Sequence, residues 1–168
     1  MTKYLLDTNI YLDFYDRYYK FNYFPSFWLF FEDIINKSVV IPKIVLNEQF
    51  QDEKFNNWIT ENYTNDIINH KDFVIGWTEV LSYLQNSPFY NDKALTSDKG
   101  WAHERIADPW LIAIAKDLNL TLVTSETRNV NLNISQPSKS AKIPDVCDKF
   151  EVACININTF FEEINLEI

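Results

Sequence analysis

The stretch Lys3–Leu6 (KYLL), followed by Asp7, is the first indication of the fold class. It is a short, mainly apolar run that is followed directly by a carboxylate. A short apolar run that ends at a charged residue is typical of a buried β-strand. A charge directly after a buried strand is costly unless it has a partner. The pattern therefore predicts a strand inside the fold and, at its carboxyl end, an acid that needs a partner.

Three further strands are expected, at Ser38–Ile41, Leu120–Thr124 and Val152–Ile155. Helical patterns separate them, and the middle of the chain, about Asp52 to Ala107, is mostly helical. Strands that alternate with helices imply right-handed crossovers and a mainly parallel sheet flanked by helices. We therefore expect one α/β domain over residues 1–168, with a central mainly parallel sheet and a helical insertion.

The composition argues against several classes of protein. The 168 residues carry a formal net charge of −9, which argues against broad electrostatic binding to nucleic acid or anionic membranes. The two glycines, Gly76 and Gly100, are too few for a phosphate-cradling loop of the Walker or dinucleotide type. No stretch approaches the ~20 apolar residues of a membrane span, and the first strand is too short for a signal-peptide core. We therefore expect a soluble, cytoplasmic protein.

Four carboxylates are expected to meet at one end of the sheet. In an open parallel sheet, ligands bind outside the carboxyl ends of the strands, near the point where the strand order reverses. Asp7 ends the first strand, and Glu126 follows two residues after the third strand ends. Glu48 lies early in the helix after the second strand, and Asp108 directly precedes Pro109 and an apolar helix.

Carboxylates that lie this close repel one another unless a proton or a cation compensates their charge. Ligands that are all oxygen suit Mg²⁺ or Mn²⁺. Such an ion would activate water and stabilise charge on a phosphoryl oxygen. The four acids therefore predict a Mg²⁺ or Mn²⁺ site.

Three of the four acids also have a simpler interpretation, which the sequence leaves open. Asp108 before Pro109 is the pattern of a helix N-cap with proline in the first helical position. Glu48 and Glu126 can be surface acids, as most glutamates are. The argument for a site rests on the shared end of the sheet and not on any single residue.

The chain resembles PIN-domain proteins at its start, where the first strand ends in Asp7-Thr8-Asn9. Over nearly its whole length it is similar to a PIN-like family, the DUF4411 group. The matching pieces are, in order, DTNIYLDFYDRYY from residue 7, FPSFW at 24–28, ADPWLIAIA at 107–115, LVTSE at 122–126, IPDVC at 143–147, and CINI with TFFEEI within 154–164.

This resemblance implies a PIN-like three-layer α/β/α fold and a Mg²⁺- or Mn²⁺-dependent ribonuclease. It also implies a bacterial toxin that pairs with an antitoxin protein. Its acidic ligands correspond to Asp7, Glu48 and Asp108. The fourth position is usually Asp in the wider class, whereas this chain has Ser125-Glu126, whose longer side chain can shift a second metal position.

Three residues are candidates to support the ligands: Asn9, Thr124 and Asp145. Asp145 also suits a local turn or cap. The aromatic residues near the N-terminus suit either a platform for unpaired bases or a core or homodimer interface. They are Tyr11, Phe14, Tyr15, Tyr18, Tyr19 and Tyr23.

The polar segment Thr127–Lys142 is expected to face the RNA substrate. It contains Arg128, Lys139 and Lys142 and no acid, so it is a basic island on an acidic protein. A connection of this length without secondary structure is unusual unless it is functional or mobile. The alternative is a solvated loop that binds no partner.

Two functions compete on the sequence. The intact set of four acids favours a metal-dependent enzyme that cleaves single-stranded RNA. The strongly acidic balance favours a catalytically weak PIN-like module that binds a protein partner. A receiver-type phosphoacceptor would need a lysine at the end of a later strand, and Thr124–Glu126 supplies none.

Overall fold

The centre of the computed structural model, which describes residues 1–48 and 52–168, is a four-stranded sheet in the order β2-β1-β3-β4. All neighbouring strands run parallel. β1 lies in the middle, because Tyr4 pairs with both Val39 and Thr121. The strands are β1 (Tyr4–Leu6), β2 (Val39–Val40), β3 (Thr121–Val123) and β4 (Cys154–Ile155).

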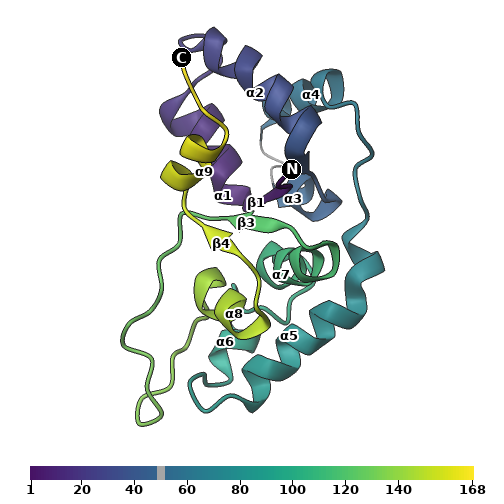
Figure 1. Cartoon of the computed structure of the whole chain (residues 1–168). Coiled ribbons are helices and arrows are strands. Elements are labelled where there is room, and N and C mark those ends of the chain that lie inside the picture. Colours follow the sequence, from purple (N-terminus) through teal and green to yellow (C-terminus); the bar gives the residue numbers. More distant parts are fainter. Residues whose placement is uncertain (49–51) are drawn as a thin grey trace.

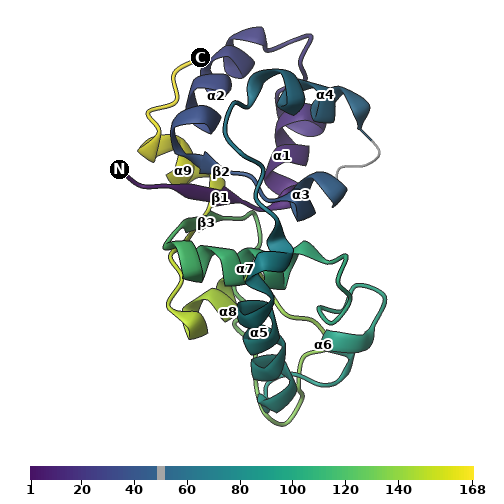
Figure 2. The same cartoon turned by 90° about the vertical axis from the view of Figure 1, so that its right-hand side faces the viewer.

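Helices cover both faces of this sheet, so the protein has three α/β/α layers (Figure 1). Figure 1 and the perpendicular view in Figure 2 place α1, α2, α4 and α9 on one face and α5 to α8 on the other. The helices are α1 (Thr8–Leu12), the π-helix η1 (Asp13–Tyr18), α2 (Pro25–Ser38), α3 (Lys43–Glu48), α4 (Glu53–Asn62), the 3₁₀-helix η2 (His70–Phe73), α5 (Val74–Asn86), α6 (Lys93–Thr96), α7 (Ala107–Leu118), α8 (Ile143–Phe150) and α9 (Ile157–Glu163).

The predicted α/β class and parallel sheet are confirmed, and each predicted strand is present but shorter than the run that predicted it. Apolar periodicity marks which residues are buried, whereas the sheet includes only those with a hydrogen-bonded neighbour. The π-helix η1 was not predicted, because its apolar pattern continues that of α1. In the described part of the chain, no helix is long and apolar enough to cross a membrane.

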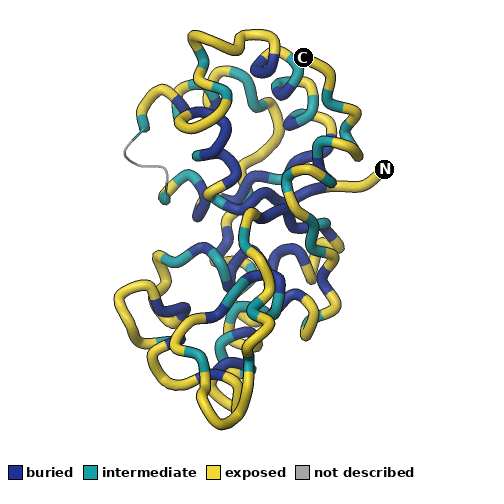
Figure 3. The backbone as a smooth tube through the Cα atoms, turned by 90° about the vertical axis from the view of Figure 1, so that its left-hand side faces the viewer, coloured by how far each residue is buried: buried dark blue, intermediate teal, exposed yellow. Residues whose placement is uncertain are grey.

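The core lies along both faces of the sheet, where Figure 3 shows the buried backbone in dark blue. On the α2 face it is largely aromatic: the rings of Phe14 and Phe27 lie 5.0 Å apart and cross at a steep angle. Tyr11 is fully buried beside them, whereas Tyr18 and Tyr23 are exposed. The core interpretation is therefore confirmed for part of the N-terminal aromatic set.

On the other face, α7 lies under the sheet and α5 packs against α7 (Figure 1). Gly76 of α5 permits this approach, because a Cβ there would lie 3.0 Å from Cβ of Ala113. After α6, a tight turn leads toward α7, and Gly100 is the residue in it whose backbone packs against that of Leu95. A Cβ on Gly100 would lie 2.2 Å from the Leu95 carbonyl oxygen, which belongs to the backbone and cannot rotate away.

We predict that Gly100→Ala lowers the free energy of unfolding by about 1–3 kcal/mol, since the added methyl group forces the backbone of the turn to shift. Urea denaturation followed by circular dichroism measures this. The matched control is the exposed neighbour Lys99→Ala, which should stay within about 0.5 kcal/mol of wild type. Equal stability of all three proteins would mean that the turn adapts at no cost.

Candidate functional site

The candidate site lies where the strand order reverses, between β1 and β3. The chain leaves β1 toward β2 on one side of it, while β3 and β4 lie on the other. Asp7 follows β1 directly, and its backbone N–H donates to the Val123 carbonyl at 2.9 Å. Thr124 follows β3 at the same edge. This is the position at which open parallel sheets bind ligands.

Asp7 is a buried acid, with only 2% of the residue exposed. Its Oδ2 accepts a hydrogen bond of 2.9 Å from the Thr124 hydroxyl, and the backbone N–H of Asn9 also bonds to the carboxylate. Burial raises the pKa of Asp7 to about 7; the Thr124 bond opposes this rise, and the charges of Glu126 and Glu48 add to it. Thr124 and Asn9 therefore contact the acid that they were predicted to support.

Asp108 lies in the first turn of α7 and does not cap it. The N-cap position is Ile106, and no side chain of that residue caps the helix. The N-cap interpretation of Asp108 is therefore wrong: α7 begins before Pro109, since proline is tolerated throughout the first turn. Burial of the Asp108 carboxyl group, and then the charge of Asp7, raise its pKa well above the ordinary value.

Glu48 ends α3 and reaches across to the start of α7. Its Oε1 accepts a 2.9 Å hydrogen bond from the backbone N–H of Ala107, and the Thr8 side chain also bonds to it. Burial raises the pKa of Glu48, while these two bonds and the charge of Arg105 oppose the rise. Glu48 is thus a partly buried acid with partners, and the surface-acid interpretation is wrong for it.

Glu126 plays the corresponding part at α8. Its Oε2 accepts a 2.7 Å hydrogen bond from the backbone N–H of Ile143, the first residue of that helix. Its own backbone N–H donates to the Thr124 hydroxyl at 3.1 Å. Each glutamate therefore satisfies one N–H at the start of a distant helix, where a negative charge is also favoured by the helix dipole.

The four predicted acids lie within electrostatic range of one another at this edge of the sheet. The charges of Asp7, Glu126 and Glu48 all raise the pKa of Asp108. Within residues 1–48 and 52–168, however, no three Asp, Glu, His or Cys side chains are gathered closely enough to hold a metal ion. The oxygen-only donors and the repulsion among them fit a hard divalent cation, but the described residues do not form a ready-made coordination cage.

A fifth acid at this edge, Asp13, was missed by the sequence analysis. It is 6% exposed and lies in η1. It pairs with Arg17 at 2.7 Å and accepts a 3.1 Å bond from the Ser125 hydroxyl. It therefore anchors the segment that carries Glu126. The acid–base pair at i and i+4 could have indicated this position, since such pairs meet on a helix surface.

The segment Thr127–Lys142 starts at the site, as predicted, but its basic residues differ in their surroundings. Arg128 makes two 2.8 Å hydrogen bonds to the Asp148 carboxylate. The charge of Lys142 lowers the pKa of Asp108, so this lysine lies near the acids. Asp145 accepts from the backbone N–H of Asn129 at 3.0 Å, 16 positions earlier in the chain, so this bond ties the loop to α8 and is neither a local turn nor a helix cap.

We predict that the metal-free protein loses stability as the pH rises from about 4 to about 7. Unfolded Asp7 titrates near its ordinary value of 3.8, and folded Asp7 near 7, so in this interval the folded state holds more protons and rising pH favours unfolding. Asp7→Asn should reduce this slope and be at least as stable as wild type at pH 8. Chemical denaturation in chelator across the pH range measures both effects.

The matched control for this prediction is Asp66→Asn, which makes the same change at an exposed acid and should keep the wild-type slope. If Asp7→Asn retains the full slope as well, the raised pKa of Asp7 is not the cause of the pH dependence of stability.

Comparison with known proteins gives a family and nothing beyond it. No curated protein and no solved structure matches the chain. The PIN-like resemblance stays a prediction. One family model, described as "Domain of unknown function (DUF4411)", matches residues 4–168, and the chain therefore belongs to the DUF4411 family.

Proposed function

We propose that the protein is a metal-dependent endoribonuclease that hydrolyses single-stranded RNA at the carboxyl end of β1 and β3. The observation that carries the proposal is the buried carboxylate of Asp7 together with the half-buried Asp108, whose pKa is raised by burial of its carboxyl group and then by the charge of Asp7. Neither acid has an ion-pair partner among the described side chains. Burying like charges together is costly, and a fold keeps such an arrangement when a ligand of opposite charge uses it.

A bound Mg²⁺ or Mn²⁺ would supply an activated water and would stabilise charge on the phosphate. The chain's own residues hold the acids in place for it. Thr124 fixes the Asp7 carboxylate by donating to Oδ2. The glutamates Glu48 and Glu126 are held by the starts of α7 and α8. Asp7, Asp108, Glu48 and Glu126 are the proposed ligands.

The biological role extends this proposal. By resemblance, we propose that the ribonuclease is the toxin of a bacterial toxin–antitoxin pair and acts in the cytoplasm on cellular RNA. The support for this step is the resemblance alone, and the antitoxin would be a protein partner.

A second candidate function is a catalytically weak module that binds a protein partner. The observation in its favour is that both glutamates are already engaged with helix N-termini, as expected if the acids only stabilise the fold. The two candidates differ in what divalent metal does to the protein, so metal-dependent experiments separate them.

We predict that Asp7→Asn and Asp108→Asn each reduce RNA cleavage at least about a hundredfold, since even residues behind metal ligands often cost 10- to 100-fold when replaced. The assay is cleavage of a mixed single-stranded RNA pool with Mn²⁺, Mg²⁺ or chelator. Asp66→Asn is the matched control and should cleave like wild type. Wild-type rates in both site variants would remove these acids from catalysis, and an inactive wild type would favour the partner-binding candidate.

We also predict that Mn²⁺ raises the thermal stability of the wild type. An ion that binds only the folded state stabilises it by ~2.7 kcal/mol at a hundredfold excess over its dissociation constant. Glu126→Gln keeps an oxygen that can accept from the Ile143 N–H but loses the charge, so its melting temperature should rise less. Equal rises in both proteins, measured by calorimetry, would show that Glu126 is not a ligand.

A further inference from the structure

A large groove opens beside the acids on the Glu48 side. Its volume is about 1110 Å³, slightly above the usual range for small-molecule sites and far more than a hydrated metal ion needs. Its walls come from α1, η1, α3, η2 and the segment before α7, together with Asp52. Glu48 and Thr8 belong both to the groove and to the candidate site, so the groove leads directly to the acids.

Three basic side chains line this groove, although the protein as a whole is acidic: Lys43, Lys71 and Arg105. All three residues are exposed, and none forms an ion pair with any described residue. Four acids line the groove as well, Asp16, Glu48, Asp52 and Glu104, so acids outnumber bases by one among its described lining residues. A phosphate would therefore be held by individual cations and not by a uniformly positive field.

The three cations come from separate parts of the groove wall: α3, η2 and the segment before α7. Arg105 is near Glu48, because its charge lowers the pKa of that acid. Lys43 and Lys71 are near His70, because their charges lower the pKa of the imidazole. Lys43 and Glu48 stand at opposite ends of α3, ~7.5 Å apart along the axis at 1.5 Å per residue.

His70 supplies a second, independent sign of a ligand. It lines the groove and is 4% exposed, with its ring 5.0 Å from that of Trp110 in an edge-to-face contact. Its Nδ1 is buried and has no hydrogen-bond partner among the described residues. A buried polar atom without a partner is costly; a ligand in the groove satisfies it only if the ring turns to bring Nδ1 to the groove surface.

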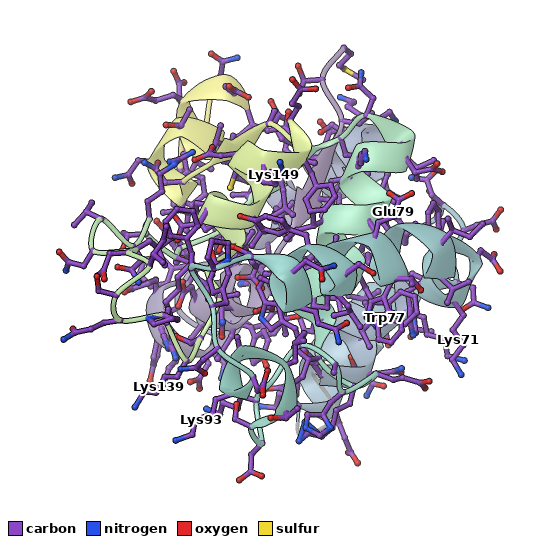
Figure 4. All side chains as sticks on the ribbon, turned by 90° about the horizontal axis from the view of Figure 1, so that it is seen from below. Lys71, Trp77, Glu79, Lys93, Lys139 and Lys149 are labelled. Carbon is purple, nitrogen blue, oxygen red and sulfur yellow. The ribbon has the colours of Figure 1, made fainter. Side chains whose placement is uncertain are left out.

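The other side of the acids is less suited to phosphate. The hollow beside Glu126 has a volume of about 320 Å³, and its single basic lining residue is Arg128, which is already paired with Asp148. Lys71 and Lys139 project from opposite sides of the molecule when it is seen from below (Figure 4). The groove and the segment Thr127–Lys142 are therefore two separate possible paths for a strand.

We propose that the groove binds the sugar–phosphate backbone of the single-stranded RNA substrate, with Lys43, Lys71 and Arg105 contacting phosphates and His70 bonding to the nucleotide between them. This inference rests on the proposed function for its choice of RNA. It departs from the expectation that Thr127–Lys142 is the main substrate-facing surface.

The test measures binding of a labelled oligouridine in chelator, where cleavage cannot occur, over a range of salt concentrations. The groove variant combines Lys43→Gln, Lys71→Gln and Arg105→Gln. The matched control combines Arg128→Gln, Lys139→Gln and Lys142→Gln, which removes the same charge from the other path. The groove variant should bind at least tenfold more weakly in low salt. Its log–log salt slope should fall by roughly two units, at ~0.7 per phosphate contact.

Two further variants keep the result interpretable. Arg105 also donates to the Asp98 carbonyl, so the double variant Lys43→Gln/Lys71→Gln serves if the triple one unfolds, with an expected fall of about 1.4 units at ~0.7 per contact. His70→Phe keeps the edge-to-face contact with Trp110 and removes the nitrogen. It should weaken binding about 2- to 10-fold without changing the salt slope, as loss of one uncharged hydrogen bond does.

The outcomes separate this inference from the proposed function. Wild-type affinity and slope in the groove variant, or a loss confined to the loop control, would overturn the groove as the RNA path. A wild type that cleaves RNA while its groove variant binds normally leaves the proposed function standing and the groove wrong. A wild type that binds through the groove but never cleaves with Mn²⁺ supports the groove and overturns the nuclease.

Discussion

The burial of the Asp7 carboxylate at the reversal of strand order is the constraint on which the rest of the site depends. The chain places this acid directly after a central strand that is covered on both faces, so water cannot solvate it freely. Thr124, directly after the neighbouring strand β3, compensates part of that loss with its hydrogen bond. Since β1 and β3 are paired, the bond also fixes the two strand ends against each other. Burying this acid therefore costs stability, while its bond to Thr124 positions the two strand ends.

The two glutamates connect this edge to the helices below the sheet. Glu48 joins α3 to the start of α7, and Glu126 joins the end of β3 to the start of α8. The same carboxylates that raise the pKa of Asp7 therefore stabilise the two helices that complete the site. A change that moves either helix must alter the electrostatics of Asp7 as well, so fold and site cannot vary independently here.

Local sequence patterns predicted the parts of the fold that local physics decides. The apolar run before Asp7 identified β1 and the acid at its end, and the apolar run after Pro109 identified α7. Asp108 was open to misreading because the group that satisfies the start of α7 comes from Glu48, 59 positions earlier in the chain. Rules that use neighbouring residues alone cannot identify a partner at that separation in the sequence. The groove was invisible for the same reason, because its walls come from separate segments of the chain.

The hydrogen bond from Ile143 to Glu126 closes the segment Thr127–Lys142 at its base. Both ends of this loop are therefore fixed beside the acids, while its outer part contacts the turn after α5, where Ser138 bonds to Phe89 and Asn91. The entropy of closing such a loop grows only slowly, by about 0.6 kcal/mol for each doubling of its length. Residues can thus be gained or lost in its outer part without moving the carboxylates.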